Sequence, residues 1–362
     1  MTTTLRFLAA ALAAALTWAL PLGRPLAAEK PKLIIGAIYV GSFNDYGYNR
    51  SFHDALMQVQ KDLPGVKVLE AENVPESAEA ERVMENMIQQ GAKLIFPTSF
   101  GHQEPAFNVA KRHPDVYFEH AGGWMMSANF GNYFGNTQAA WYPMGVAAGK
   151  MTKTGKLGFV IGVPIGFAVG NVNAFALGAR TVNPRVQTIV VVTGGWSDKA
   201  KEAAAANALL DQGCDVLAMH VDSPATIIQT AEGRGAMSVG FQSIEARALA
   251  PKGWITGLGF TWAPYFTDVA KSVIAGAFKP ASTHLGLGEG MVTIAPFGAA
   301  VPADVQKLVT ASADRIAKGF NPFTGPIVDN TGVIQIPAGE SWGGDKMGNF
   351  KWYVEGVVGK VQ

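Results

Sequence analysis

The chain of 362 residues carries 29 Lys and Arg against 28 Asp and Glu, a formal net charge of +1. This balance offers no basic surface for nucleic acid and no attraction to an anionic membrane, so we expect neither as a partner. The single cysteine, Cys214, excludes an internal disulfide framework and a cysteine-rich metal site.

Residues 1–28 have the pattern of a secretory signal peptide. Arg6 precedes a short run rich in Ala and Leu, and small residues end the segment at Ala27 and Ala28. The run is too short to span a bilayer. We expect cleavage and export to the periplasm, without a lipid anchor because no cysteine lies near the cleavage region. Cleavage leaves 27 basic and 28 acidic residues, a net charge near −1.

The rest of the chain alternates apolar runs with amphipathic segments. The predicted strands are 33–40, 66–70, 93–96, 116–118, 132–136, 157–161, 187–192, 216–219, 236–240 and 254–260. The predicted helices are 48–63, 77–90, 104–112, 138–151, 171–180, 199–212, 224–232, 264–278 and 301–318, and 283–294 reads as extended chain. Strands separated by helices at this rhythm predict doubly wound parallel sheets, and the rhythm restarts near residue 157 as a second α/β domain.

The turn after the first strand carries Asn44 and Asp45. In an open parallel sheet the carboxyl ends of the strands form the edge where ligands bind, so both residues are candidate ligand contacts. The competing interpretation is that they cap the following helix. The residues alone leave both interpretations open.

Loops after other strands also pair an aromatic residue with a small polar one. The set comprises Phe43-Asn44-Asp45, Ser99-Phe100, Gly166-Phe167, Gly195-Trp196-Ser197, Asp222-Ser223 and Phe260-Thr261-Trp262. Gathered at one edge of two facing sheets, such side chains suit a flat heterocycle, which stacks on rings and needs partners for its polar edge. Asp45 can accept from a ring N–H, and Asn44 can both donate and accept.

Catalytic and metal-binding patterns are not found in the sequence. The six histidines have no metal-ligand spacing, and no Gly-x-Ser-x-Gly elbow occurs. The glycine-rich segment from Gly162 to Gly170 follows a strand, but a proline interrupts it and no Lys-Ser/Thr follows, so it is a weak phosphate loop. We expect a binding protein without cofactor or metal. The alternatives are a secreted α/β hydrolase with Asp45 as base, or a binding protein for another small amide, sugar or amino acid.

Four motifs in order resemble the basic membrane protein family of periplasmic solute-binding proteins, which includes purine nucleoside receptors. They are Asn44-Asp45-Tyr-Gly-Tyr48-Asn49, Thr98-Ser-Phe-Gly101, Phe118-Glu-His-Ala121 and His220-Val-Asp222-Ser-Pro224. The resemblance covers roughly residues 32 to 335.

The resemblance implies a two-lobed type I periplasmic binding fold, with two doubly wound parallel sheets joined by a hinge of three crossings. Lobe 1 is then 29–136 plus 254–290, lobe 2 is 137–253 plus 291–335, and 336–362 is a C-terminal tail. It also implies a partner, an ABC permease of the inner membrane with its ATPase, and we expect a monomer.

The family's binding positions imply ligand contacts at Asn44, Asp45, Ser99, Phe100, Phe167, Trp196 and Asp222. We also expect contacts from Tyr48 and Trp262, which makes nine candidate residues. Nucleoside-binding relatives hold the ribose with an acid and a lysine. Here the corresponding loop, 259–264, has no lysine and carries the bulky Trp262. We therefore expect a purine base such as adenine to bind more tightly than a nucleoside.

Overall fold

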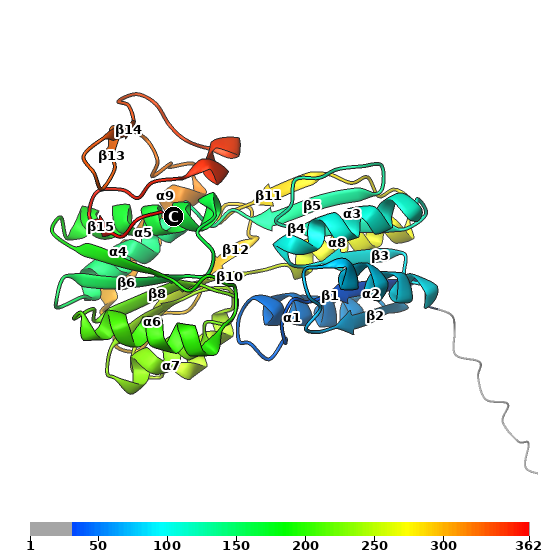
Figure 1. Ribbon diagram of the computed structural model, residues 1–362, viewed down its shortest axis with the longest axis horizontal. Coiled ribbons are helices and arrows are strands. Elements are labelled where there is room, and N and C mark those ends of the chain that lie inside the picture. Colours follow the sequence, from blue (N-terminus) through cyan, green and yellow to red (C-terminus); the bar gives the residue numbers. More distant parts are fainter. Residues whose placement is uncertain (1–30, 362) are drawn as a thin grey trace, which may run out of the picture. The chain divides into compact units, whose positions relative to one another are not determined.

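The computed structural model describes residues 31–361, and the predicted signal peptide lies outside this range. The described residues build two large sheets, each covered on both faces by helices (Figure 1). No helix in this part of the chain has the length and apolarity needed to cross a membrane.

The first sheet has six parallel strands in the order β11-β5-β4-β3-β1-β2. Its strands are β1 (Leu33–Ile38), β2 (Val66–Ala71), β3 (Leu94–Pro97), β4 (Tyr117–Ala121), β5 (Phe130–Gly135) and β11 (Ser282–Leu285). Helices α1 (Tyr48–Asp62) and α8 (Ala263–Ile274) bury their apolar sides on one face. Helices α2 (Ala78–Gln89) and α3 (Gln103–Arg112) cover the other, and the short η1 (Phe100–His102) precedes α3.

The second sheet has seven strands in the order β12-β10-β9-β8-β6-β7-β15. They are β6 (Lys156–Ile161), β7 (Gln187–Val192), β8 (Val216–His220), β9 (Met237–Gly240), β10 (Trp254–Phe260), β12 (Val292–Ile294) and β15 (Val357–Val358). Strand β12 runs antiparallel to β10, and the other pairs are parallel.

Five helices and a short 3-10 turn cover this second sheet. One face carries α4 (Trp141–Met151), α5 (Gly166–Val182) and α9 (Ala303–Ala317). The other carries α6 (Lys199–Asp211), α7 (Ala225–Gly233) and η2 (Ile244–Leu249). The first five strands of each sheet have the same order, so the predicted pair of doubly wound sheets of one plan is confirmed.

The placement of residues 254–260 in the first lobe was wrong. Strand β10 pairs with β9 and β12 in the second sheet, so the chain crosses after Phe260, where α8 then packs beside α1. The buried run from Trp254 to Phe260 pairs with β9 as the fifth parallel strand of the second sheet. The local sequence does not reveal this pairing. The stretch predicted as one extended segment, 283–294, divides between β11 in the first sheet and β12 in the second.

The C-terminal tail belongs to the second sheet. After the small β13 (Ile327–Val328) and β14 (Ile334–Ile336) hairpin comes η3 (Gly344–Asn349), and β15 then pairs with β7. Phe350, Tyr353 and Val357 are buried in the core that also contains α5.

Candidate functional site

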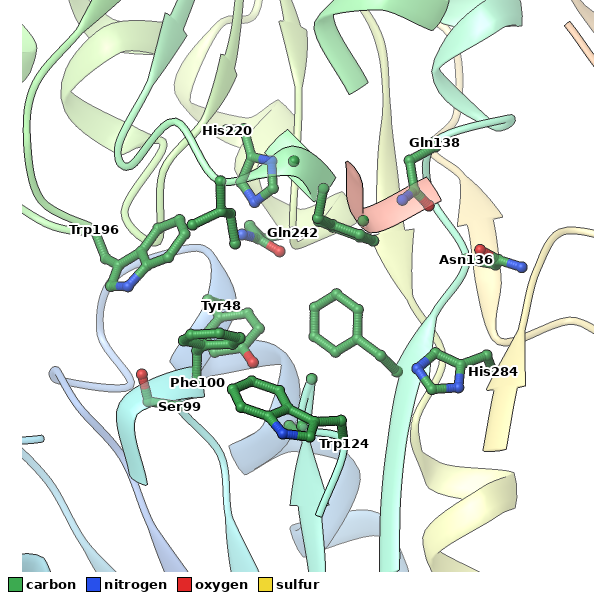
Figure 2. Close-up of a pocket in the computed structure, with 18 of the residues that line it drawn as sticks. Tyr48, Ser99, Phe100, Trp124, Asn136, Gln138, Trp196, His220, Gln242 and His284 are labelled. Atoms are coloured by element: carbon green, nitrogen blue, oxygen red, sulfur yellow. The ribbon is translucent and has the colours of Figure 1, made fainter. Parts of the chain in front are cut away.

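A cavity of about 720 Å³ lies where the carboxyl ends of the two sheets approach each other (Figure 2). Two hydrogen bonds join the two sides beside it: Tyr48 N–H donates to the Asp222 carbonyl over 2.9 Å, and the Ser223 side chain donates from Oγ to the Asp45 carbonyl over 3.3 Å. In both sheets this edge includes the point where the strand order reverses, between β1 and β3 and between β6 and β8. Such switch points are the usual ligand sites of doubly wound sheets.

Aromatic side chains from both sheets form much of the wall. Phe134 packs against Phe167 with ring centroids 5.2 Å apart, and Phe100 lies 5.6 Å from Trp124 at the rim. Trp196 lies on the second sheet's side, 6.0 Å from the His220 ring. These rings offer stacking surfaces to a flat ligand.

Asp222 brings a carboxyl to this cavity, although the residue is only 5% exposed. Its backbone is fixed because its N–H donates to the Trp196 carbonyl over 2.8 Å. Burial raises its carboxyl pKa well above the usual range, and the negative charges of Asp45, Glu76 and Glu202 add to that shift. Among the described residues no side chain donates a hydrogen bond to this carboxyl.

His220 is held so that it offers a donor. The Asn171 side-chain amide lies 2.9 Å from its Nδ1, and Asn171 Oδ1 in turn accepts from Thr137 Oγ1 over 3.1 Å. Burial lowers the imidazole pKa to about 3, so the ring is neutral at physiological pH. With Nδ1 accepting from Asn171, the proton resides on Nε2, which has no partner in the described part of the chain.

Gln242 offers an acceptor from the loop after β9. Its backbone adopts φ 78°, a region that residues other than glycine seldom occupy. Its Nε2 donates to the Val221 carbonyl over 3.3 Å, and its buried Oε1 has no hydrogen-bond partner among the described atoms. A strained backbone and an unsatisfied acceptor at a cavity wall point to a ligand contact.

The residues that line the cavity carry little charge. Of the described residues that line the cavity, none is Lys or Arg. An anionic phosphate or carboxylate would therefore lose its hydration without gaining a cation. Within residues 31–361 no cluster of three His, Cys, Asp or Glu has the arrangement of a metal site.

The structure brings six of the nine predicted site residues to the cavity: Tyr48, Ser99, Phe100, Phe167, Trp196 and Asp222. Tyr48 is tied in place because its hydroxyl donates to the Thr98 carbonyl over 2.6 Å. The other three, Asn44, Asp45 and Trp262, are not among the lining residues.

Asp45 caps helix α1, and its proposed ligand contact is corrected. Its two carboxylate oxygens accept from the backbone N–H groups of Gly47, Asn49 and Arg50 at 2.8–3.1 Å, and from Asn49 Nδ2 at 2.8 Å. All four are local partners at the start of a helix, which is the capping interpretation. The neighbouring Asn44 is exposed.

Trp262 lies in the core of the first sheet, which corrects its expected place beside the ligand. It is 1% exposed and stacks on Phe52 and Phe260 at centroid distances of 4.9 and 4.3 Å. Its indole N–H donates to Ser51 Oγ over 3.0 Å. The indole therefore does not occupy space that a ribose would need.

Sequence reasoning missed several lining residues. Gln242 follows β9 at the same edge as the predicted loops, so the same rule would have found it. Trp124 lies in an irregular segment after β4, and Phe134 and Asn136 lie at the end of β5. Gly344 and Gly348 come from the tail, and nothing in the sequence connects them to this site.

Comparisons with known proteins agree with this architecture. The family model for PnrA-like ABC transporter substrate-binding proteins, named Bmp, matches residues 32–320. A purine-binding protein from Brucella abortus is 39% identical over 332 residues, which cover 91% of this chain and 94% of that protein. A putative ABC transporter glucose-binding protein from Haloferax volcanii is 29% identical, over 90% of this chain and 80% of that one.

Two solved structures of ABC transporter solute-binding proteins have the same fold. The Conexibacter woesei protein has a TM-score of 0.66 and 26% identity, with 79% of this chain and 97% of that chain covered. The Aeropyrum pernix protein has a TM-score of 0.69 at 20% identity, with 79% and 92% covered.

Proposed function

Because the chain belongs to the Bmp family of PnrA-like ABC transporter substrate-binding proteins, we propose that its ligand is a purine, bound in the cavity between the two sheets. The family and the type I periplasmic binding fold expected from the sequence are confirmed. Members of this family bind substrates for transporters and are not enzymes, so the hydrolase alternative is set aside.

The proposal rests on the arrangement of three polar groups among the aromatic rings that line the cavity. The Asp222 carboxyl and Gln242 Oε1 offer acceptors, and His220 Nε2 offers a donor. A purine carries N–H donors and ring-nitrogen acceptors on one flat edge, so it could satisfy all three together. A purine N–H donated to Asp222 would also favour its ionised form, offsetting the effect of burial.

The rings supply the remaining affinity in this proposal. Stacking of a base on one aromatic side chain contributes roughly 1–3 kcal/mol. Phe167 at the start of α5 and Trp196 in the loop after β7 present rings to the cavity. The absence of Lys and Arg from the described lining favours a base or nucleoside over a nucleotide, whose phosphate would need a cation.

The preference for a free base no longer follows from Trp262, because that indole lies in the core. A cavity of about 720 Å³ has room for a base or for a nucleoside. We therefore propose the purine class, with either form as ligand.

A sugar is the second candidate. A relative described as a putative glucose-binding protein is 29% identical to this chain. Asn136, Gln138 and His284 form a polar part of the lining, and amides beside aromatic rings also suit sugar hydroxyls.

In the cell, the proposed role is delivery of the purine to an ABC permease from the periplasm, by a monomeric protein. Closure of two domains about hinge segments is the motion by which such binding proteins enclose a ligand. The three chain crossings between the sheets are the segments that would bend.

Mass spectrometry of the small molecule that co-purifies with the protein, released by denaturation, tests the proposal. We expect a purine base or nucleoside. Release of a hexose in stoichiometric amount, with no purine, would contradict the proposal and support the second candidate.

A further inference from the structure

One face of helix α5 contacts the C-terminal tail. Gly166, Gly170 and Asn173 are spaced by four and three residues, so they share one face of the helix. A Cβ at Gly166 would lie 1.9 Å from the Gly348 carbonyl oxygen, and one at Gly170 would lie 2.9 Å from Phe350 Cδ2. The glycines thus allow the tail to lie directly on the helix backbone.

Asn173 holds the tail further along the same face of the helix. Its Nδ2 donates to the Trp352 carbonyl over 2.9 Å, and its Oδ1 accepts from the Val354 N–H over 2.9 Å. The residue is fully buried, and its bond from the Val354 N–H is buried as well. The glycine-rich segment considered as a phosphate loop is therefore the start of a helix that docks the tail.

Residues 337–349 form a strap between two buried anchors. Ile336 and Phe350 are 0% and 1% exposed, and both belong to the core around α5. Between them, η3 brings Gly344 and Gly348 to the lining of the cavity, beside Gly166 and Phe167. In Figure 2 the ribbon of this C-terminal segment, in faint red, borders the cavity near Gln138.

The strap lies outside the part of the chain that the family model matches, which ends at residue 320. It nevertheless reaches the cavity described above. We propose that the strap is a wall of the purine site, an inference that rests on the proposed function. In this proposal the strap contacts the ligand at Gly344 and Gly348 and limits the size of the ligand that the site accepts.

A larger side chain at Gly348 would test whether the strap limits the size of the ligand. A Cβ built there meets no other heavy atom within 4 Å, and its backbone does not have a positive φ. A side chain at this position would therefore enter open space at the cavity wall. Gly233, at the end of α7, has the same two properties and does not line the cavity. It provides a matched control.

The experiment is calorimetric titration of adenine and adenosine against wild type, Gly348→Leu and Gly233→Leu. We expect Gly348→Leu to weaken adenosine at least about tenfold and adenine much less, because only the larger ligand meets the added side chain. Gly233→Leu should bind both as wild type does. Equal loss of both ligands, or no loss, in folded Gly348→Leu overturns the inference.

A second measurement covers the case in which Gly348→Leu does not fold. The native Cys214 is buried and burial raises its thiol pKa to about 11, so it reacts slowly with maleimide. The thiol introduced by Gly348→Cys should be alkylated at least about tenfold more slowly with saturating adenosine, and that of Gly233→Cys at an unchanged rate. An unchanged rate at position 348 contradicts the inference. Wild type that binds neither purine overturns the proposed function, and the inference with it.

Discussion

The Asn171 side-chain amide lies 2.9 Å from Nδ1 of His220, and both residues are buried. This bond fixes a neutral imidazole with its proton on Nε2, the nitrogen left for the ligand. The bond from Asn171 to Nδ1 thus determines that Nε2 of His220 donates, rather than accepts, toward the cavity.

His220→Phe should therefore weaken purine binding about 10- to 100-fold, because the ring volume stays and the donor is lost. It should also lower the free energy of unfolding by about 1–3 kcal/mol, since the Asn171 amide loses its buried acceptor. In the double variant His220→Phe with Asn171→Leu, stability should recover only in part, because Thr137 Oγ1 loses its acceptor, and binding should not recover. Calorimetric titration and chemical denaturation of both variants measure this, and recovery of affinity in the double variant would contradict the assigned donor.

Asp45 and Asp222 should respond in opposite ways. Asp45→Ala removes the cap of α1, so we expect a loss of about 1–2 kcal/mol of stability with purine affinity nearly unchanged. Asp222→Asn should lose about 2 kcal/mol of binding, while its stability stays the same or rises because a buried, unpartnered carboxyl is removed. Denaturation and titration on the two variants measure both effects. The reverse pattern would return Asp45 to the ligand site.

Trp262→Ala should destabilise the first domain without altering the relative affinity for base and nucleoside. Its indole stacks between Phe52 and Phe260, and loss of a buried Trp costs about 3–5 kcal/mol. Thermal unfolding measures the first effect, and the ratio of adenine to adenosine affinities measures the second. A changed ratio would show that the indole does reach the ligand.

Glu119 should make stability depend on pH. Glu119 belongs to β4, and its carboxyl is buried. The Tyr265 hydroxyl donates to Oε2 over 2.8 Å, and Oε1 has no partner among the described atoms. Burial raises its pKa to about 8. The unfolded chain releases this proton first, so the stabilising contribution is complete below about pH 4.5 and is lost as pH rises through about 8.

Comparison of wild type with Glu119→Gln isolates this effect. Buried His120 and His220, whose pKa values burial lowers to about 3, shift stability in the opposite direction, but they are common to both proteins. From pH 5 to pH 8 we expect wild type to lose on the order of 3 kcal/mol relative to the variant. Denaturation curves at the two pH values measure it, and a constant difference between the proteins would place an ionised carboxylate in the fold at pH 5.

The alternation of apolar runs and amphipathic segments was enough to predict the two doubly wound sheets, because each strand and helix is local in sequence. The change of sheet was not local. Trp254–Phe260 has the same buried pattern whichever sheet it joins, and only its pairing with β9 decides that it lies in the second. The boundary was therefore misplaced by the length of one strand.

The site was predictable to the extent that strand ends determine it. Ser99, Trp196 and Asp222 reach the cavity because they follow strands whose carboxyl ends meet there. The direction of a side chain within such a loop depends on its neighbours. Asp45 turns back to the N–H groups of α1, and Trp262 turns toward Phe52 in the core. The strap was not predictable, since its place depends on docking against a helix more than 170 residues earlier in the chain.

Titration of purified, ligand-stripped wild type with adenine, adenosine and glucose distinguishes a purine-binding protein from a sugar-binding one. We predict one purine bound per chain, with a dissociation constant of about 1 μM or tighter, and no heat from glucose. Binding of glucose with no measurable affinity for either purine would contradict it.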